Sequence, residues 1–92
     1  MIQSFKDEDT RELYEKGSSR RWAAIQVVAL RKLDQIEVAV NLSDLRVPPG
    51  NRLESLKGDR SGQHSIRVND QYRICFVWLA DGAHEVEITD YH

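Results

Sequence analysis

The last three residues of the chain bring together side chains that can transfer protons. Asp90 carries a carboxylate, Tyr91 a phenol and His92 an imidazole, and groups of these kinds act as general acids and bases. Terminal residues are usually frayed and dispensable, so an inert tail is the alternative interpretation. Asp90 and His92 are also metal-ligand types, but no third ligand follows at a recognisable spacing. We therefore expect no metal site and no cofactor.

Arg67 and Arg73 form a second candidate site. Each belongs to a segment in which every second residue is apolar, which is typical of a strand with one buried face. A three-residue loop, 69–71, keeps both apolar sets on one face and places Arg67 directly opposite Arg73 on the other. Like charges there destabilise a sheet, and a phosphate between the guanidinium groups would remove the repulsion. Alternatively, both arginines point into water or pair with Glu85 or Glu87.

The next hairpin brings the chain end toward the same arginines. One continuous apolar face predicts a loop at 81–83 that pairs Trp78 with Val86. Extended along the strands, this ladder places Tyr91 beside Arg73. A tyrosine there could donate a hydrogen bond to phosphate or stack on a base.

Lys57 and Arg60 flank a basic turn with the sequence Lys-Gly-Asp-Arg. The turn is either a phosphate-contacting loop or a solvated reverse turn, because runs of charge are common on exposed loops.

Other residues of reactive or stacking type fit structural roles better. Trp22, Phe76 and Trp78 share the apolar periodicities, so we expect them in the core. His64 has the same parity as the core residues and is expected to be partly buried and hydrogen-bonded. Cys75 falls on the opposite face; no function is predicted for it, and as the only cysteine it forms no internal disulfide.

Charge is distributed unevenly along the chain. The formal net charge is −2, but residues 16–73 hold eleven Lys or Arg against six Asp or Glu. A basic block between acidic ends can form one positive face that meets a polyanion, although a solvated mixed surface fits the same counts.

Length and composition indicate one domain, and the order of its expected helices and strands places it in the α+β class. Ninety-two residues, 40% of them hydrophobic, suffice for one core. The chain shows neither a signal peptide nor a transmembrane stretch, and its single cysteine suits a reducing cytosol.

The expected elements are two helices followed by an antiparallel meander. Residues 7–16 predict a short helix that Gly17 ends, and Ser18 or Ser19 is expected to cap a longer one. Segment 52–57 is a weaker strand candidate. The helices are expected to cover the even-numbered face of the sheet. Their apolar stripe and the three even-numbered strand sets comprise Trp22, Ile25, Ala29, Leu33, Ile36 and Val40, then His64, Ile66 and Val68, then Tyr72, Ile74, Phe76 and Trp78, then Val86 and Ile88.

Residues 53–78 and the terminal Asp-Tyr-His closely resemble HigB-type toxins of the RelE-like superfamily of type II toxin–antitoxin systems. The shared pattern is L-x-G-x-R-x-G, S-I-R, N-x-Q-Y-R-I and D-Y-H, and the likeness extends over essentially the whole chain. The resemblance implies a RelE-like fold and a cytoplasmic, ribosome-dependent mRNA endonuclease. Such an enzyme activates the ribose 2′-OH against the adjacent phosphate in the ribosomal A site.

The resemblance also implies roles for particular residues. Arg73 would clamp the phosphate and Lys57 would add a second charge. Tyr91 would orient the nucleotide, while Asp90 and His92 would transfer protons. Further RNA-binding candidates are Arg67, Arg60 and Glu54.

Two departures affect this assignment. Some family members have a histidine where this chain has Glu54, so either activity is weak or Glu54 takes over as a base. Strict alternation also places Asp90 and His92 on the face opposite Arg73 and Tyr91, unless a bulge or a loss of pairing turns them.

The partners implied by the resemblance are the 70S ribosome, mRNA and a HigA-like helix-turn-helix antitoxin. DNA would be bound only through that antitoxin, and no membrane is involved. Two other functions stay open, namely a non-catalytic module that binds RNA, the ribosome or the antitoxin, and a small protein-interaction domain without a nucleic-acid role.

Overall fold

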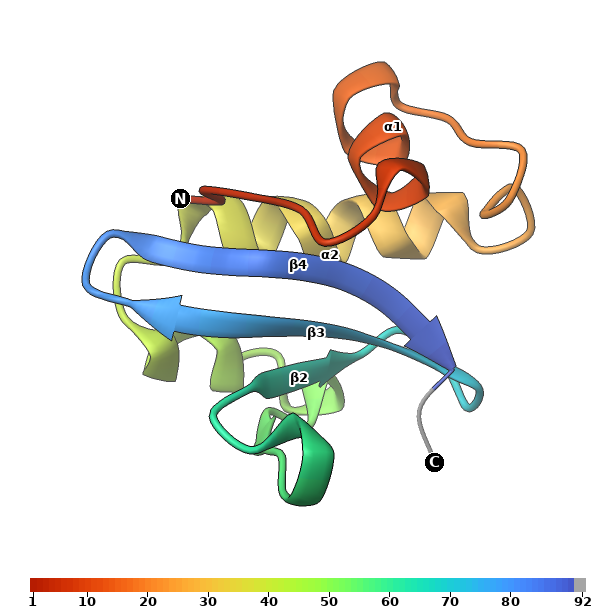
Figure 1. Ribbon diagram of the computed structural model, residues 1–92. Coiled ribbons are helices and arrows are strands. Elements are labelled where there is room, and N and C mark those ends of the chain that lie inside the picture. Colours follow the sequence, from red (N-terminus) through yellow and green to blue (C-terminus); the bar gives the residue numbers. More distant parts are fainter. Residues whose placement is uncertain (91–92) are drawn as a thin grey trace.

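Two helices precede a four-stranded antiparallel sheet in the computed structural model, which describes residues 1–90 (Figure 1). This confirms the predicted α+β class, and α2 runs behind the sheet in the view of Figure 1. Among the described residues no helix is long and apolar enough to cross a membrane. The elements are α1 (Glu8–Lys16), α2 (Gln26–Val38), the 3-10 turns η1 (Leu42–Arg46), η2 (Pro49–Asn51) and η3 (Gly58–Arg60), and the strands β1 (Glu54–Ser55), β2 (His64–Arg67), β3 (Tyr72–Leu79) and β4 (Gly82–Asp90).

Helix α1 confirms the short helix predicted at 7–16. The Asp7 carboxylate accepts a hydrogen bond from the Thr10 backbone N–H, which satisfies a donor that the helix start leaves unpaired. Gly17 ends the helix in the left-handed conformation, with φ of 78°. The Thr10 hydroxyl also accepts a hydrogen bond from the Ile88 backbone N–H at 3.1 Å, which ties α1 to β4.

Helix α2 is shorter than the sequence predicts. It begins at Gln26, whereas Ser18 or Ser19 was expected to cap it, and the intervening chain forms a turn closed by the Ile25 N–H on the Trp22 carbonyl. The Ser19 hydroxyl is buried and has no hydrogen-bond partner among the residues described, so it caps nothing. The helix ends at Val38, which removes Val40 from the apolar stripe and leaves it 81% exposed.

The first hairpin has the predicted register. Ile66 lies opposite Ile74 and Arg67 opposite Arg73. The Val68 N–H donates to the Tyr72 carbonyl, and the loop 69–71 closes the hairpin as expected. The hydrophobic pattern therefore sufficed to determine this pairing.

The second hairpin contradicts the prediction of a loop at 81–83. Gly82 already pairs with Leu79, so the turn consists of residues 80–81 and ends two residues earlier than predicted, and Ala83 pairs with Trp78 in place of Val86. A bulge between Cys75 and Val77 then restores Val86 to the core face. Glu85 lies in the bulge with φ of 53°, a left-handed conformation that non-glycine residues rarely adopt. As a consequence Arg73 lies opposite Thr89, and the predicted pairing of Arg73 with Tyr91 is wrong.

The core lies between the helices and the even-numbered face of the sheet, as predicted. Ala29, Leu33 and Ile36 of α2 are buried in the same cluster as Ile74 and Phe76 of β3. On the N-terminal side, residues 2–5 run alongside β4 and cover its edge through isolated bridges. The Met1 carbonyl accepts from the Ala83 N–H so close to Gly82 that a side chain there would collide with it.

A buried amide anchors the irregular segment between α2 and β1. Asn51 is fully buried, and its side-chain nitrogen donates to the Gln35 side chain and to the Leu45 carbonyl. Its side-chain oxygen accepts a hydrogen bond from the Lys32 ammonium, which is also buried. Burial lowers the pKa of Lys32 below its usual value, and nearby Arg31 and Arg67 lower it further.

We predict that Asn51→Ala destabilises the protein by at least about 2 kcal/mol, because it leaves a buried ammonium without an acceptor. Urea denaturation at pH 7 measures this loss. Adding Lys32→Met should recover part of it, since the double variant no longer buries a charge. Additive losses in the double variant would contradict this account of the Lys32–Asn51 contact.

A second prediction concerns pH. The folded-state pKa of Lys32 lies below the usual 10.5, so between the two values the unfolded chain binds more protons than the folded one. The free energy of unfolding therefore gains a term that increases as pH rises through this window. The difference between wild type and Lys32→Met should show the rise, because contributions of other groups cancel. Parallel stability curves for the two proteins would exclude the effect.

Candidate functional site

The Arg73 side chain lies across the sheet toward β1 and is only 12% exposed. Its Nε donates to the Ser65 hydroxyl at 2.7 Å, and its Nη2 donates to the Arg52 carbonyl at 2.6 Å. The Glu54 carboxylate lies 3.2 Å from Nη2. The Ser65 carbonyl also lies 3.4 Å from Nη2, so three neutral acceptors and one carboxylate fix the plane of the guanidinium group.

Arg67 lies opposite Arg73, but the two guanidinium groups have separate carboxylate partners. Arg67 forms an ion pair with Asp70 in the adjoining loop, while Arg73 pairs with Glu54. The partners are thus neither Glu85 nor Glu87, which the sequence offered as alternatives. Because each cation is compensated locally, the fold does not require an anion between them.

A hollow of about 280 Å³ lies beside these two arginines. Both arginines line it, so an anion that entered would meet two guanidinium groups. The remaining lining comes from the segment before β1 and from the loop between β2 and β3. The lining residues are Arg52, Glu54, Arg67, Asn69, Asp70, Gln71 and Arg73.

A third arginine, Arg60, is held by Glu87 on the same face of the sheet. The two charged groups are 2.7 Å apart, and Lys6 approaches the same carboxylate at 3.6 Å. Cys75, opposite Glu87 in the register, is fully buried. Burial raises the pKa of its thiol, and Arg60 acts in the opposite direction. The thiol is therefore protonated and inert at neutral pH.

Lys57 is exposed at the start of η3, in the basic turn that the sequence singled out. No ion pair involves Lys57 among residues 1–90. The turn itself is a single 3-10 turn, Gly58–Arg60, whose last residue is the Arg60 that binds Glu87. The two ends of the basic turn thus differ: Lys57 is exposed to solvent, whereas Arg60 is bound to Glu87.

Asp90 lies on the face opposite Arg73. It pairs with Tyr72 at the end of β4 and accepts a hydrogen bond from the Gln71 side chain at 3.2 Å. It lines a separate hollow of about 450 Å³ together with Trp22 and Tyr72. Regular pairing therefore continues to the end of β4 and does not turn Asp90 toward the arginines. Tyr91 and His92 lie outside the described residues.

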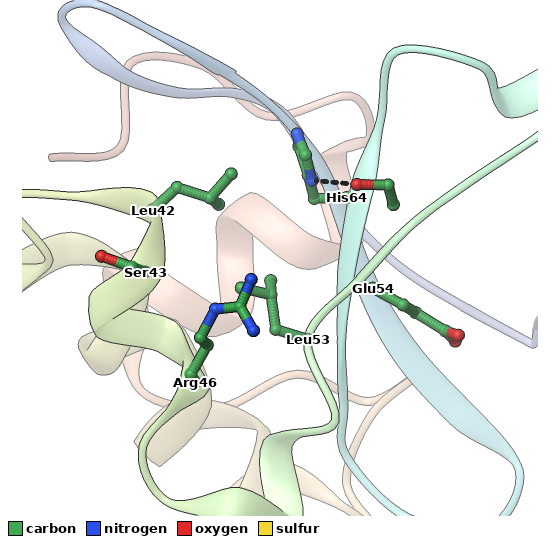
Figure 2. Close-up of a pocket in the computed structure, with 7 residues that line it drawn as sticks. Leu42, Ser43, Arg46, Leu53, Glu54 and His64 are labelled. Carbon is green, nitrogen blue, oxygen red and sulfur yellow. Dashed lines mark hydrogen bonds between the residues drawn. The ribbon is translucent and has the colours of Figure 1, made fainter.

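A groove of about 340 Å³ lies between η1 and β1, on the other side of Glu54 (Figure 2). Leu42, Arg46, Leu53 and His64 point into it, whereas the Glu54 side chain points away. His64 is half-buried and bonds the Ser55 hydroxyl at 3.2 Å, as expected for a structural histidine. Glu54 therefore lines both hollows, while its side chain points away from this groove and its carboxylate pairs with Arg73.

Two features of the site were missed from the sequence. Ser65 and the Arg52 carbonyl both accept hydrogen bonds from Arg73. Ser65 gave one signal, a small polar residue at an odd position between His64 and Ile66 of the core-facing set, whereas a backbone acceptor has no signature in a sequence. In the part of the chain that the structure describes, no group of three His, Cys, Asp or Glu residues could hold a metal ion.

The sequence matches known proteins over nearly its whole length, including all residues of the arginine site. Residues 3–92 match the family model for the RelE-like toxin of the type II toxin–antitoxin system HigB. Toxin HigB-1 of Vibrio cholerae is 43% identical over 81 residues, which cover 86% of this chain and 85% of that protein. Endoribonuclease HigB of Proteus vulgaris is 34% identical over 93 residues and the full length of both chains.

A solved structure shows the same fold. The YoeB/ParE toxin from Agrobacterium tumefaciens superposes with a TM-score of 0.56 at 18% sequence identity, covering 98% of this chain and 99% of that one. Together with the match over residues 3–92 and the two relatives, the likeness shows that this chain belongs to the HigB family of RelE-like type II toxins.

Proposed function

We propose that the protein is a cytoplasmic endoribonuclease that cuts translated mRNA in the ribosomal A site. Arg73 carries the proposal, because its guanidinium plane is fixed beside a hollow that Arg67 also lines. A cation held in one orientation stabilises charge that develops on a phosphate without reorganising during the reaction. The Proteus vulgaris relative named as an endoribonuclease supports the same activity.

The reaction that suits these groups is attack of the ribose 2′-OH on the adjacent phosphorus. The attack forms a cyclic phosphate and releases the 5′ oxygen of the next nucleotide. Arg73 and Arg67 would hold the phosphate, and Lys57 would add positive charge. By family resemblance, His92 would transfer protons and Tyr91 would orient the nucleotide. Asp90 lies on the face opposite Arg73, so we assign it no part in this step.

Dependence on the ribosome follows from how few groups this chain supplies. Its cations compensate charge on the phosphate, but the alignment of the 2′-OH with the leaving oxygen requires an ordered strand. The ribosome would provide that order. The partner that silences the toxin would be a HigA-like antitoxin, in keeping with the type II family.

We predict that Arg73→Ala lowers cleavage by about a hundredfold or more, because one preorganised cation is lost from the transition state. Mapping of mRNA 5′ ends in a translating extract measures the cuts, which should fall in frame with codons. Arg11→Ala removes the same charge from exposed α1 and should cleave like wild type.

A second function has one observation in its favour. The Glu54 carboxylate neutralises the charge of Arg73, as expected for a module that binds RNA or antitoxin without cutting. If the wild-type protein associates with ribosomes and leaves no cuts at translated codons, this non-catalytic function replaces the nuclease.

We also predict that Glu54→Gln binds a short single-stranded RNA about three- to tenfold more tightly, because Arg73 then loses its resident anion. One additional phosphate contact should steepen the dependence of log K on log salt by about 0.7. Fluorescence anisotropy over a range of salt concentrations measures both quantities. Glu15→Gln makes the same charge change on exposed α1 and serves as the control. Equal affinities of the two variants would rule out competition by Glu54.

A further inference from the structure

The fold alone does not explain why a polar residue occupies the buried position 65. Ser65 is a hydroxyl residue with 0% exposure in the middle of the sheet, opposite Glu54 on one side and Cys75 on the other. An apolar residue of similar size would satisfy the packing there. The Ser65 hydroxyl accepts the Arg73 Nε–H at 2.7 Å, and its carbonyl lies 3.4 Å from Nη2.

We propose that Ser65 is a positioning residue that sets the orientation of the Arg73 guanidinium toward the scissile phosphate. The inference rests on the proposed nuclease function and names a residue for which neither the motif nor the family comparison gives a role. Ser65 would act through Arg73 and would not touch the substrate.

The acceptors around Arg73 divide into two kinds. Ser65 and the Arg52 carbonyl are neutral, so they fix the guanidinium plane without cancelling its charge. Glu54 is anionic and 53% exposed at its side chain, so a phosphate can displace it. After that exchange the neutral acceptors of Ser65 and Arg52 would still hold the plane of the guanidinium group.

The orientation they impose leaves one edge of the guanidinium for a ligand. Nε and Nη2 carry all the hydrogen bonds that Arg73 makes within residues 1–90, and Nη1 carries none. Arg73 also lines the 280 Å³ hollow. Without the Ser65 acceptor the side chain could rotate about its last bonds and present other nitrogens, so the clamp would no longer be preorganised.

The test compares Ser65→Ala with Ser55→Ala in steady-state cleavage by ribosomes programmed with a defined mRNA. Ser55 is a matched control, since its hydroxyl also bonds one side chain, His64, on the neighbouring strand. Ser65→Ala should lower kcat about ten- to hundredfold, because misplacement by a fraction of an ångström is enough for such a loss. Its KM should stay within about threefold of wild type, as expected when an interaction matters in the transition state.

A second readout separates positioning from a purely structural role. In the free protein, hydrogen exchange of the Arg73 Nε–H, followed by NMR, should be slow in wild type and fast in Ser65→Ala. The Arg60 side chain, bound to Glu87 elsewhere on the face, should be unaffected. Wild-type kcat in Ser65→Ala, an equal loss in Ser55→Ala, or a change confined to KM would each overturn the inference.

The two proposals fail in different ways. If Arg73→Ala cleaves like wild type, the proposed nuclease site is wrong and the role of Ser65 falls with it. If Arg73→Ala loses cleavage while Ser65→Ala keeps wild-type kcat, only the positioning inference is wrong.

Discussion

The hydrogen bonds of the buried Asn51 amide determine where the site can form. Asn51 joins Lys32 and Gln35 of α2 to the Leu45 carbonyl, so one side chain connects the helix to the irregular chain before β1. Arg52 follows directly, and its carbonyl accepts from Arg73. A segment without regular hydrogen bonding of its own thus presents a backbone acceptor at a fixed place. The Arg73 orientation therefore derives from the core as well as from the sheet.

Local compensation explains how a chain of net charge −2 can bring three arginines to one face of its sheet. Arg60, Arg67 and Arg73 each have a carboxylate partner, so the sheet tolerates them without a bound ligand. Binding of a phosphate is consequently an exchange of one anion for another, which yields less affinity than the meeting of two unpaired charges. A toxin built in this way would bind free RNA weakly and would depend on a partner that orders the strand.

The first hairpin shows how far alternation of apolar residues can predict a site. Arg67 lies opposite Arg73, as predicted, because a shift of one residue in either direction would expose the core face. The second hairpin shows the limit. A bulge at Glu85 adds a residue to one strand and preserves the buried face while changing every pairing beyond it. The bulge shifts the buried positions of β4 from the odd-numbered Ala83 to the even-numbered Val86 and Ile88, so strict alternation extended back from Val86 gives the wrong partners in β3.

The sequence did not predict the start of α2 or the hydrogen-bond partners of Arg73, because both depend on tertiary contacts. Packing contacts, such as the edge-to-face contact of Trp22 with Tyr72 at 5.3 Å, compete with local capping signals, and here they prevail over Ser19. The partners of Arg73 come from two separate segments, residues 52–54 and Ser65, and the acceptor at Arg52 is a backbone carbonyl. The sequence could identify Arg73 as a cation suited to binding phosphate. Only the tertiary structure could identify Ser65, Arg52 and Glu54 as the residues that hold its side chain.

The exposure of Glu54, Asp70 and Glu87 indicates which of these carboxylates a phosphate could replace as the partner of an arginine. The Asp70 side chain is fully exposed, Glu54 is 53% exposed, and Glu87 is only 14% exposed. Water screens and replaces an exposed carboxylate readily, but a buried one leaves an uncompensated cation behind. Arg67 and Arg73 are therefore the cations that can exchange their anions, and Arg60 is held in a structural pair. The site thus holds two arginines whose carboxylate partners are exposed enough to be replaced, and the guanidinium plane of one of them, Arg73, is fixed by neutral acceptors.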